Sequence, residues 1–192
     1  MAGFFLVPAA TFAAGCVFLN LSGLRSEDED EEGKAETRVT ARRIGIISDT
    51  HGLLRQEVVE ILKTCDCIFH AGDIGTEEIL EQLHSMGKLF VVRGNGDAAS
   101  WAEGLEESMK LRVGERCVFI THEEKDVPKD LGGIDVVIFG HSHKYFCETK
   151  EGILWLNPGG CGRKRFRLPV TMAVLELGQD GMRVKKYNLD KG

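Results

Sequence analysis

The chain has 192 residues, of which 43% are hydrophobic and only four are proline, a composition typical of one ordinary globular domain. Residues 1–41 hold three basic and seven acidic side chains, which leaves a near-neutral remainder of 21 Lys and Arg against 23 Asp and Glu. This balance lacks the basic excess of a nucleic-acid-binding surface, so it favours a small substrate.

The first 24 residues contain no charged side chain, and six consecutive acids follow at 27–32. A secretory signal would begin with basic residues, which are missing here, and Pro8 makes the segment a poor membrane anchor. A tail or a misassigned start is the preferred interpretation, with signal or anchor as the alternative. We therefore expect residues 1–41 to be an apolar segment plus an acidic linker (26–40), residues 42–192 to form the domain, and the protein to be cytoplasmic unless residues 1–24 anchor or export it.

From residue 43 onward, apolar strands alternate with helices. The pattern predicts strands at 43–48, 66–70 and 88–92, with helices at 55–63 and 76–84 between them. Such alternation predicts parallel pairing through right-handed crossovers, with functional loops at the carboxyl ends of the strands.

After Trp101 the pattern changes to closely spaced strands joined by predicted hairpin turns at 114–115, 151–152 and 179–181. Seven strands are expected, at 109–113, 116–121, 136–139, 145–150, 153–156, 170–177 and 182–187. Two sheets packed face to face with helices outside accommodate both halves of the chain. The order of the strands does not follow from the sequence.

Six cysteines fit neither a disulfide framework nor a tetrahedral zinc site. The Cys65-x-Cys67 pair has no second pair to complete such a site. We expect buried, small hydrophobic side chains and a reducing compartment.

Potential metal ligands follow the ends of five predicted strands. Carboxylate, amide and imidazole groups together suit divalent first-row metals, with oxygen ligands favouring manganese. Any one of these residues alone is better explained as a helix cap, a turn residue or a surface histidine. Their occurrence in series predicts a metal site formed by Asp49, His51, Asp73, Asn95, His122, His141 and His143.

These residues stand in blocks that resemble, in order, those of the calcineurin-like metallophosphoesterases, in particular their small bacterial and archaeal phosphodiesterase branch. The blocks are Asp49-Thr50-His51, Gly72-Asp73, Gly94-Asn95-Gly96-Asp97, Thr121-His122, Gly140-His141-Ser142-His143 and Asn157-Pro158-Gly159. The resemblance implies an α/β fold, a four-layer αββα sandwich of two mixed sheets flanked by helices. It also implies one metal held by Asp49, His51 and His143, a second held by Asn95, His122 and His141, and Asp73 bridging both.

By the same resemblance, the protein is a phosphoesterase, expected to act on diesters by in-line attack of a metal-bridging hydroxide. Its cofactors are two divalent ions, manganese first and zinc, nickel, iron or cobalt as alternatives, and the catalytic residues are Asp73, Asn95 and His122. The expected partner is a small phosphate ester; a homo-oligomer stays open, and membrane contact is expected only through the N-terminal segment. The alternatives are a non-catalytic protein-binding scaffold of the same fold and a metal-dependent nuclease.

Two positions depart from the family pattern. Gly96 stands where many larger relatives carry a histidine that assists the leaving group, and Glu123 stands where relatives commonly have glycine. Loss of the acid favours esters with good leaving groups, so diesters are expected over unactivated monoesters.

Three further features leave alternatives open. Asp97 either orients a water at the site or caps the next segment. His70 is a core residue, a support for a ligand or a substrate contact. Four basic residues within 163–167 form either a solvated loop or an anion-binding rim in which Arg163, with Asn95, contacts the substrate.

Overall fold

The computed structural model describes residues 37–165, 167–179 and 181–190. Residues 1–24 and most of the expected linker lie outside this part of the chain. The helices are α1 (Gln56–Leu62), α2 (Glu77–Ser85) and the 3-10 turns η1 (Ser100–Ala102) and η2 (Glu124–Asp126). The strands are β1 (Thr37–Val39), β2 (Arg43–Ile47), β3 (Cys67–His70), β4 (Lys88–Val91), β5 (Ser108–Val113), β6 (Arg116–Thr121), β7 (Val136–Ile138), β8 (Phe146–Lys150), β9 (Ile153–Asn157), β10 (Thr171–Gly178) and β11 (Gly181–Asn188).

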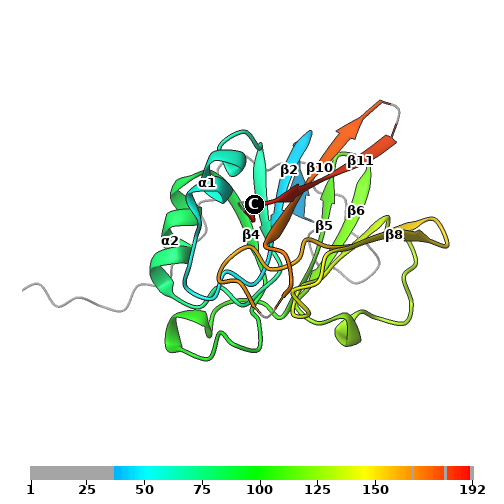
Figure 1. Ribbon diagram of the computed structural model, residues 1–192. Coiled ribbons are helices and arrows are strands. Elements are labelled where there is room, and N and C mark those ends of the chain that lie inside the picture. The colour runs from blue at the N-terminus through cyan, green and yellow to red at the C-terminus, as the bar shows by residue number, and fades with distance from the viewer. Residues whose placement is uncertain (1–36, 166, 180, 191–192) are drawn as a thin grey trace, which may run out of the picture.

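Five strands form a sheet in the order β11-β10-β2-β3-β4. The pairs β2–β3 and β3–β4 are parallel, which confirms the pairing predicted from the strand–helix alternation. β10 returns from the far end of the chain and pairs antiparallel with β2, so the sheet is mixed. The β10–β11 hairpin extends beyond the sheet at the upper right of Figure 1.

The other six strands form a second mixed sheet in the order β1-β5-β6-β7-β9-β8. The hairpins β5–β6 and β8–β9 are antiparallel, as predicted from their glycine-containing turns. The β6–β7 and β7–β9 pairs are parallel.

The two sheets pack face to face over the largest apolar cluster, which draws on both. Helices α1 and α2 cover the outer face of the five-stranded sheet (Figure 1), where Val58, Leu62, Ile79 and Leu83 are buried. Two packed mixed sheets with helices outside are therefore confirmed. A loop that contains η2 lies over the outer face of the six-stranded sheet. Its Val127, Leu131 and Ile134 pack against the apolar side chains of that face.

β1 corrects the expected start of the folded region. It lies inside the segment expected as an acidic linker, yet it pairs in parallel with β5, and its Val39 is buried. Gly114 N also donates a hydrogen bond to Val39 O. The folded region therefore includes Thr37–Val39 and does not start at residue 42, because three residues next to the acidic run supply the edge of a sheet.

None of the helices described is long and apolar enough to span a membrane. The five cysteines within the described ranges are all free, and Cys67, Cys117 and Cys161 are buried as small hydrophobic side chains.

Candidate metal centre

The seven predicted ligands come together at one end of the sandwich. Asp49 and His51 follow β2, Asp73 follows β3 and Asn95 follows β4, while His122 follows β6 and the remaining two histidines follow β7. Strands β2, β3 and β4 are parallel neighbours in the five-stranded sheet, and β6 and β7 are parallel neighbours in the other sheet. Within each group the carboxyl ends of the strands therefore lie at the same end of the sheet. This topology gathers residues that are up to 94 positions apart, from Asp49 to His143.

Backbone strain concentrates at these same residues. Six non-glycine residues within the described ranges have a positive φ, and five of them are predicted ligands: Asp49, His51, Asp73, His141 and His143, with φ between 45° and 64°. Side chains with a Cβ rarely occupy this left-handed region, and residues held there cluster at functional sites. The strain therefore marks these loops as functional.

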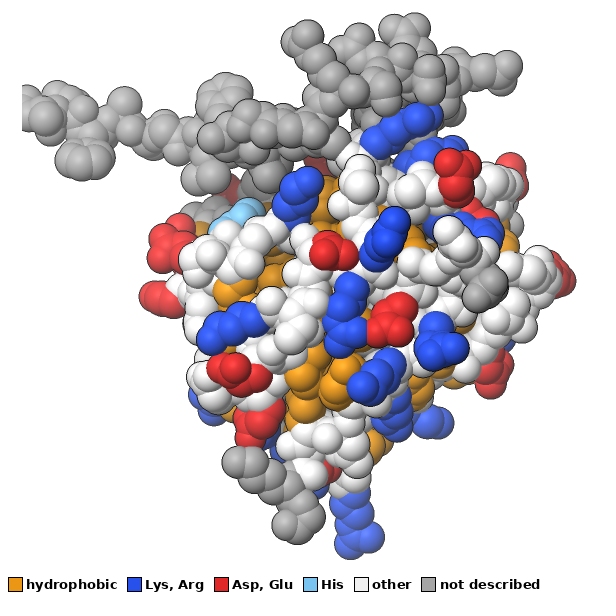
Figure 2. Space-filling model, turned by 90° about the horizontal axis from the view of Figure 1, so that it is seen from above, with side chains coloured by type: hydrophobic (Ala, Val, Ile, Leu, Met, Phe, Trp, Pro, Cys, Tyr) orange, Lys and Arg blue, Asp and Glu red, His pale blue; other side chains and the backbone are white. Residues whose placement is uncertain are grey.

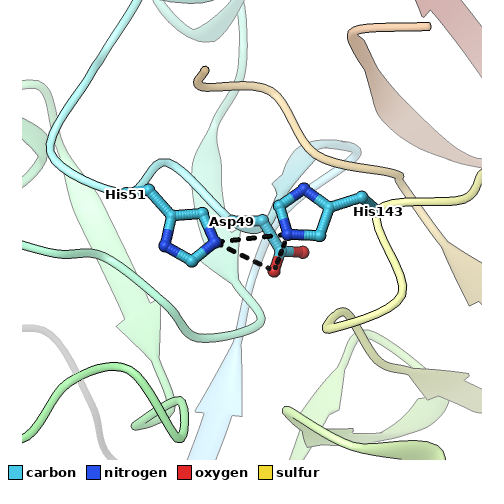
Figure 3. A group of neighbouring side chains, drawn as sticks. All are labelled: Asp49, His51 and His143. Atoms are coloured by element: carbon cyan, nitrogen blue, oxygen red, sulfur yellow. Dashed lines mark hydrogen bonds and ion pairs between the residues drawn. The ribbon is translucent and has the colours of Figure 1, made fainter. Parts of the chain in front are cut away.

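One half of the centre is formed by Asp49, His51 and His143, which converge in Figure 3. The two Nε2 atoms are 3.2 Å apart, and Asp49 Oδ1 lies 3.3 Å from His143 Nε2 and 3.7 Å from His51 Nε2. Asp49 Oδ1 is buried and has no hydrogen-bond partner. A buried carboxylate oxygen left in this state is costly unless a cation or a proton compensates it.

The second half is formed by Asn95, His122 and His141. His122 Nδ1 lies 2.7 Å from Ala71 O, so it donates its proton there and turns Nε2 toward the site. That Nε2 is 3.1 Å from Asn95 Oδ1, and the same oxygen is 2.9 Å from His141 Nδ1. Electron-pair donors therefore face one another here as well.

Asp73 lies between the two halves. Its Oδ2 is 3.5 Å from His51 Nε2, and its Oδ1 is 3.5 Å from His122 Nε2. Burial raises the pKa of Asp73, but hydrogen bonds from His122 and from the Gly96 N–H, together with the charges of both histidines, outweigh it and hold the pKa at about 2. Asp73 is therefore ionised at neutral pH, with one oxygen toward each half.

The pKa values of the remaining ligands are set mainly by burial. Burial raises the pKa of Asp49 to about 6, against a hydrogen bond from Ser48. It also lowers the pKa of His51, and it lowers that of His143 to about 4, so both imidazoles are neutral at pH 7. For His122, burial is outweighed by its contacts with Asp73 and Ala71, and the pKa is raised. Metals bind neutral imidazoles and ionised carboxylates, so His51 and His143 already have the protonation state that a metal needs.

Two glycines let the ligand loops approach one another. A Cβ at Gly94 would lie 2.1 Å from the backbone N of Asp73, and a Cβ at Gly72, where φ is +86°, would lie 2.6 Å from His122 Nδ1. Only glycine fits at these contacts. The sequence pattern of glycine directly before a ligand thus has a packing cause.

Comparison with known proteins agrees with this geometry. Residues 43–180 match the calcineurin-like phosphoesterase superfamily domain. The chain belongs to this superfamily.

Two curated relatives are similar to this phosphoesterase chain in sequence. The probable metallophosphoesterase YsnB of Bacillus subtilis is 31% identical over 157 residues, which cover 74% of this chain and 89% of that protein. A probable metallophosphoesterase of Methanocaldococcus jannaschii is 33% identical over 131 residues, which cover 60% of this chain and 66% of the relative, just under two thirds of its length.

Solved structures share the fold. An archaeal phosphodiesterase superposes with a TM-score of 0.63 and 23% identity, covering 76% of this chain and 99% of its own. Vacuolar Protein Sorting 29 from Cryptosporidium parvum superposes with a TM-score of 0.60 and 20% identity, covering 80% of this chain and all of its own. At these identities the likeness concerns the fold alone.

His70 supports the ligand loops of the phosphoesterase from beneath. Its side chain is fully buried, which rules out the substrate contact considered from sequence. Nδ1 accepts a hydrogen bond from Gly72 N at 3.1 Å, so Nε2 carries the proton and donates it to Thr50 Oγ1 at 3.0 Å. Thr50 Oγ1 in turn donates to Ile74 O at 2.9 Å. Burial lowers the pKa of His70 to about 3, so a neutral imidazole ties the β2 loop to the β3 loop.

Asp97 has a similar bracing role. It is buried, and its carboxylate accepts hydrogen bonds from Gly75 N and Gly94 N, each at 2.9 Å. Each carboxylate oxygen accepts one backbone hydrogen bond and keeps a further lone pair, so the water-orienting alternative stays open. Asp97 thus ties the loop after β3 to the loop after β4.

Sequence reasoning gave no role to Ser48 or to the side chain of Asn157. Ser48 Oγ donates to Asp49 Oδ2 at 2.7 Å, which fixes the carboxylate with its other oxygen toward the histidines. Asn157 Nδ2 donates to Gly140 O at 2.6 Å and to Ser142 Oγ at 3.1 Å, and so holds the loop that carries His141 and His143. The only sequence signal for Ser48 is its position at a strand end, whereas Asn157 also begins the last block of the family resemblance.

Glu123 lies at the edge of the site and does not fill it. Its Oε2 lies 2.9 Å from Lys125 Nζ and 3.8 Å from His141 Nε2. The side chain lines a cavity of about 350 Å³ that also touches Asn95 and His122. This cavity lies beside the second half of the centre and has room for part of a substrate.

The basic segment 163–167 lies beside the first half of the centre. Arg163 is exposed, and no direct contact joins it to the seven ligands. Arg165 is the guanidinium whose charge is among the main causes that lower the pKa of His51 and His143. The segment thus lies on the side of Asp49, His51 and His143, and the substrate contact of Arg163 stays a prediction.

Proposed function

We propose that this protein is a phosphoesterase that uses two divalent metal ions and acts on phosphodiesters. The observation that carries the proposal is the close approach of imidazole, amide and carboxylate groups on both sides of Asp73, with 3.1 to 3.5 Å between their nitrogen and oxygen atoms. These are the groups that bind divalent first-row metals. The unpaired buried Oδ1 of Asp49 fits the same interpretation.

The assignment of ligands to two ions follows the distances. Asp49, His51 and His143 would hold one ion, and Asn95, His122 and His141 the other, with one oxygen of Asp73 toward each. The mixture of three oxygen and four imidazole ligands favours manganese and admits zinc, nickel, iron or cobalt. When bound, two such ions supply positive charge at the phosphoryl oxygens and lower the pKa of a water held between them.

The chain's own residues prepare this chemistry in three ways. Asp73 stays ionised and keeps the two halves in register. Asn95 is a neutral ligand, so the centre keeps more net positive charge for an anionic substrate than a third carboxylate would leave. His70 and Asp97 brace the loops so that the ligands are arranged before a substrate arrives.

Gly96 supports the preference for diesters. Its backbone N donates to Asp73 Oδ1 at 2.7 Å, but it has no side chain to protonate a leaving group. Esters whose leaving group departs without a proton are therefore preferred. With the manganese-loaded protein, we expect aryl phosphodiesters to be hydrolysed faster than alkyl monoesters. The reverse order would contradict the preference.

A protein-binding scaffold is the main alternative, because a fold does not determine function. All seven ligand positions carry suitable donors, whereas a scaffold could lose them freely. We expect Asp73→Asn and His141→Ala to abolish hydrolysis while circular dichroism shows that both variants stay folded. Full hydrolysis by these variants would contradict the proposal.

A nuclease is the less favoured alternative. Residues 42–192 hold 21 Lys and Arg against 23 Asp and Glu, and on the face seen in Figure 2 the two kinds of side chain are interspersed. Nucleic-acid affinity depends on neutralising many phosphates. The charge pattern therefore favours a small phosphate ester.

A further inference from the structure

The segment 163–167 presents basic side chains that the proposed chemistry does not use. Arg163, Lys164, Arg165 and Arg167 are all exposed. Lys164 Nζ is 3.1 Å from Asp190 Oδ2, but none of the three arginines has a carboxylate partner within the described part of the chain. Among the described residues, these three guanidinium groups are thus the basic groups beside the centre that an external anion could meet.

The backbone before this segment is packed against the β2 loop. Cys161 N donates to Ser48 O at 3.1 Å, and a Cβ at Gly162 would lie only 2.0 Å from Thr50 O. Thr50 stands between two predicted ligands, so Gly162 contacts the loop that carries both. The first arginine follows one residue later.

Further contacts hold the segment in place. Arg55 Nε donates to Gly162 O at 2.7 Å, and Leu168 N donates to Arg165 O at 3.1 Å. A Cβ at Gly160 would lie 2.4 Å from His143 Nδ1, so the chain also runs against that ligand. The arginines therefore start from a fixed position beside the first half of the centre.

The other half of the centre has the opposite charge. The cavity beside Asn95 and His122 is lined by Glu107, Glu123 and Asp126, and also by Arg93, which pairs with Glu107. A long polyanion crossing both halves would meet these carboxylates. A compact substrate with an additional negative charge on one side only would meet the arginines and avoid the acids.

We propose that Arg165, together with Arg163, forms a subsite for a second phosphoryl group of the substrate, next to the Asp49, His51 and His143 half of the centre. This inference rests on the proposed function and narrows its substrate class to small phosphate esters that carry a further phosphate. A planar guanidinium can bind two phosphate oxygens at once, which gives arginine an advantage over lysine at such a subsite.

The kinetic test uses two p-nitrophenyl esters of thymidine 5′-phosphate, one of which also carries a 3′-phosphate. Both release the same leaving group, so they differ only in the added charge. For the manganese-loaded full chain, we expect a lower KM for the 3′-phosphorylated ester. Arg165→Ala should reduce this KM advantage by about tenfold or more, the range for loss of a charged hydrogen bond. Arg165→Lys should retain part of it.

Arg183→Ala is the matched control, because it removes an exposed guanidinium from β11 at the far end of the sheet. We expect it to leave the ratio of the two KM values unchanged. An equal rise in both KM values in Arg165→Ala would overturn the subsite. If a DNA strand of 12 nucleotides inhibited ester hydrolysis at a lower concentration than thymidine 3′,5′-bisphosphate does, the proposal of a compact substrate would be wrong.

A binding experiment separates the subsite from catalysis. Inorganic phosphate added to the metal-free, 15N-labelled full chain should shift the amide signals of residues 161–165, and Arg165→Ala should abolish these shifts. If the shifts occur but no ester is hydrolysed, the subsite stands and the proposed function fails. If esters are hydrolysed but the signals of 161–165 do not shift, the subsite is wrong.

Discussion

At the scale of single residues, Asp49 combines a stability cost with a functional role. Its carboxyl is buried with one unpaired oxygen, and its pKa is raised to about 6. Between about pH 4, the ordinary value, and pH 6, the folded chain binds more protons at Asp49 than the unfolded chain does. The contribution of Asp49 to stability therefore decreases as the pH rises through this window.

Asp49→Asn should consequently stabilise the metal-free protein at pH 7 by up to about 3 kcal/mol, the cost corresponding to a shift of about two pKa units. The same change should remove most of the stabilisation that manganese gives the wild type. Urea unfolding in chelator and in manganese, from pH 4 to 7, measures both effects. The lowered pKa values of His70 and Asp73 make the unfolding free energy rise with pH, the opposite of the effect of Asp49. Because both proteins contain His70 and Asp73, the difference between wild type and variant isolates the effect of Asp49. A variant less stable than wild type without metal would refute this account.

Thr50 tests the bracing role of His70. Thr50→Val removes the hydroxyl that accepts the His70 Nε2 proton and donates to Ile74 O, which leaves buried polar groups unpaired. We expect a loss of about 1 to 3 kcal/mol in unfolding free energy and about tenfold weaker manganese binding by calorimetry. Thr50→Ser keeps the hydroxyl and should recover both. Unchanged manganese affinity in Thr50→Val would show that His70 supports the fold but not the ligands.

At the scale of secondary-structure elements, β1 is the strand with the most direct consequence for stability. Removing residues 1–36 keeps β1, whereas removing residues 1–40 exposes the edge of β5 and the pocket of Val39. The longer truncation should lower the unfolding free energy by about 2 to 3 kcal/mol, the range for burial of one valine. It should also favour association through the exposed strand edge, measurable by sedimentation. Equal stability of the two truncated proteins would mean that β1 contributes nothing.

The elements also show what the sequence can predict. The strands and helices after residue 42 were predicted within one or two residues of their observed positions, because apolar periodicity and glycine turns are local signals. β1 was missed because three residues beside an acidic run have no periodicity of their own. Strand order, including β10 beside β2, depends on pairing between distant segments.

The candidate site shows the same contrast between features that local sequence predicts and features that depend on packing. The seven candidate ligands could be picked out from the sequence because each follows an apolar strand. The bonds of His70 to Gly72 and Thr50 could not be predicted, since they depend on how two loops pack. The placement of the basic segment beside these ligands depends on the path of the loop around Gly162, which packs against Thr50.

At the scale of the whole molecule, the charge is divided across the site. Arginines flank the Asp49, His51 and His143 half, while carboxylates line the cavity beside the other half. The described fold as a whole lacks a large basic excess, so attraction of an anionic substrate depends on the metal centre and on Arg165. This arrangement suits a compact phosphate ester better than a long polyanion.

The central claim is that two metal ions held around Asp73 hydrolyse phosphate esters. Its most direct test is hydrolysis of bis(p-nitrophenyl) phosphate by chelator-treated protein, measured against added equivalents of manganese. The account predicts no hydrolysis without metal and a rate that reaches its plateau at two equivalents per chain. Full activity without metal, or a plateau at one equivalent, would contradict it.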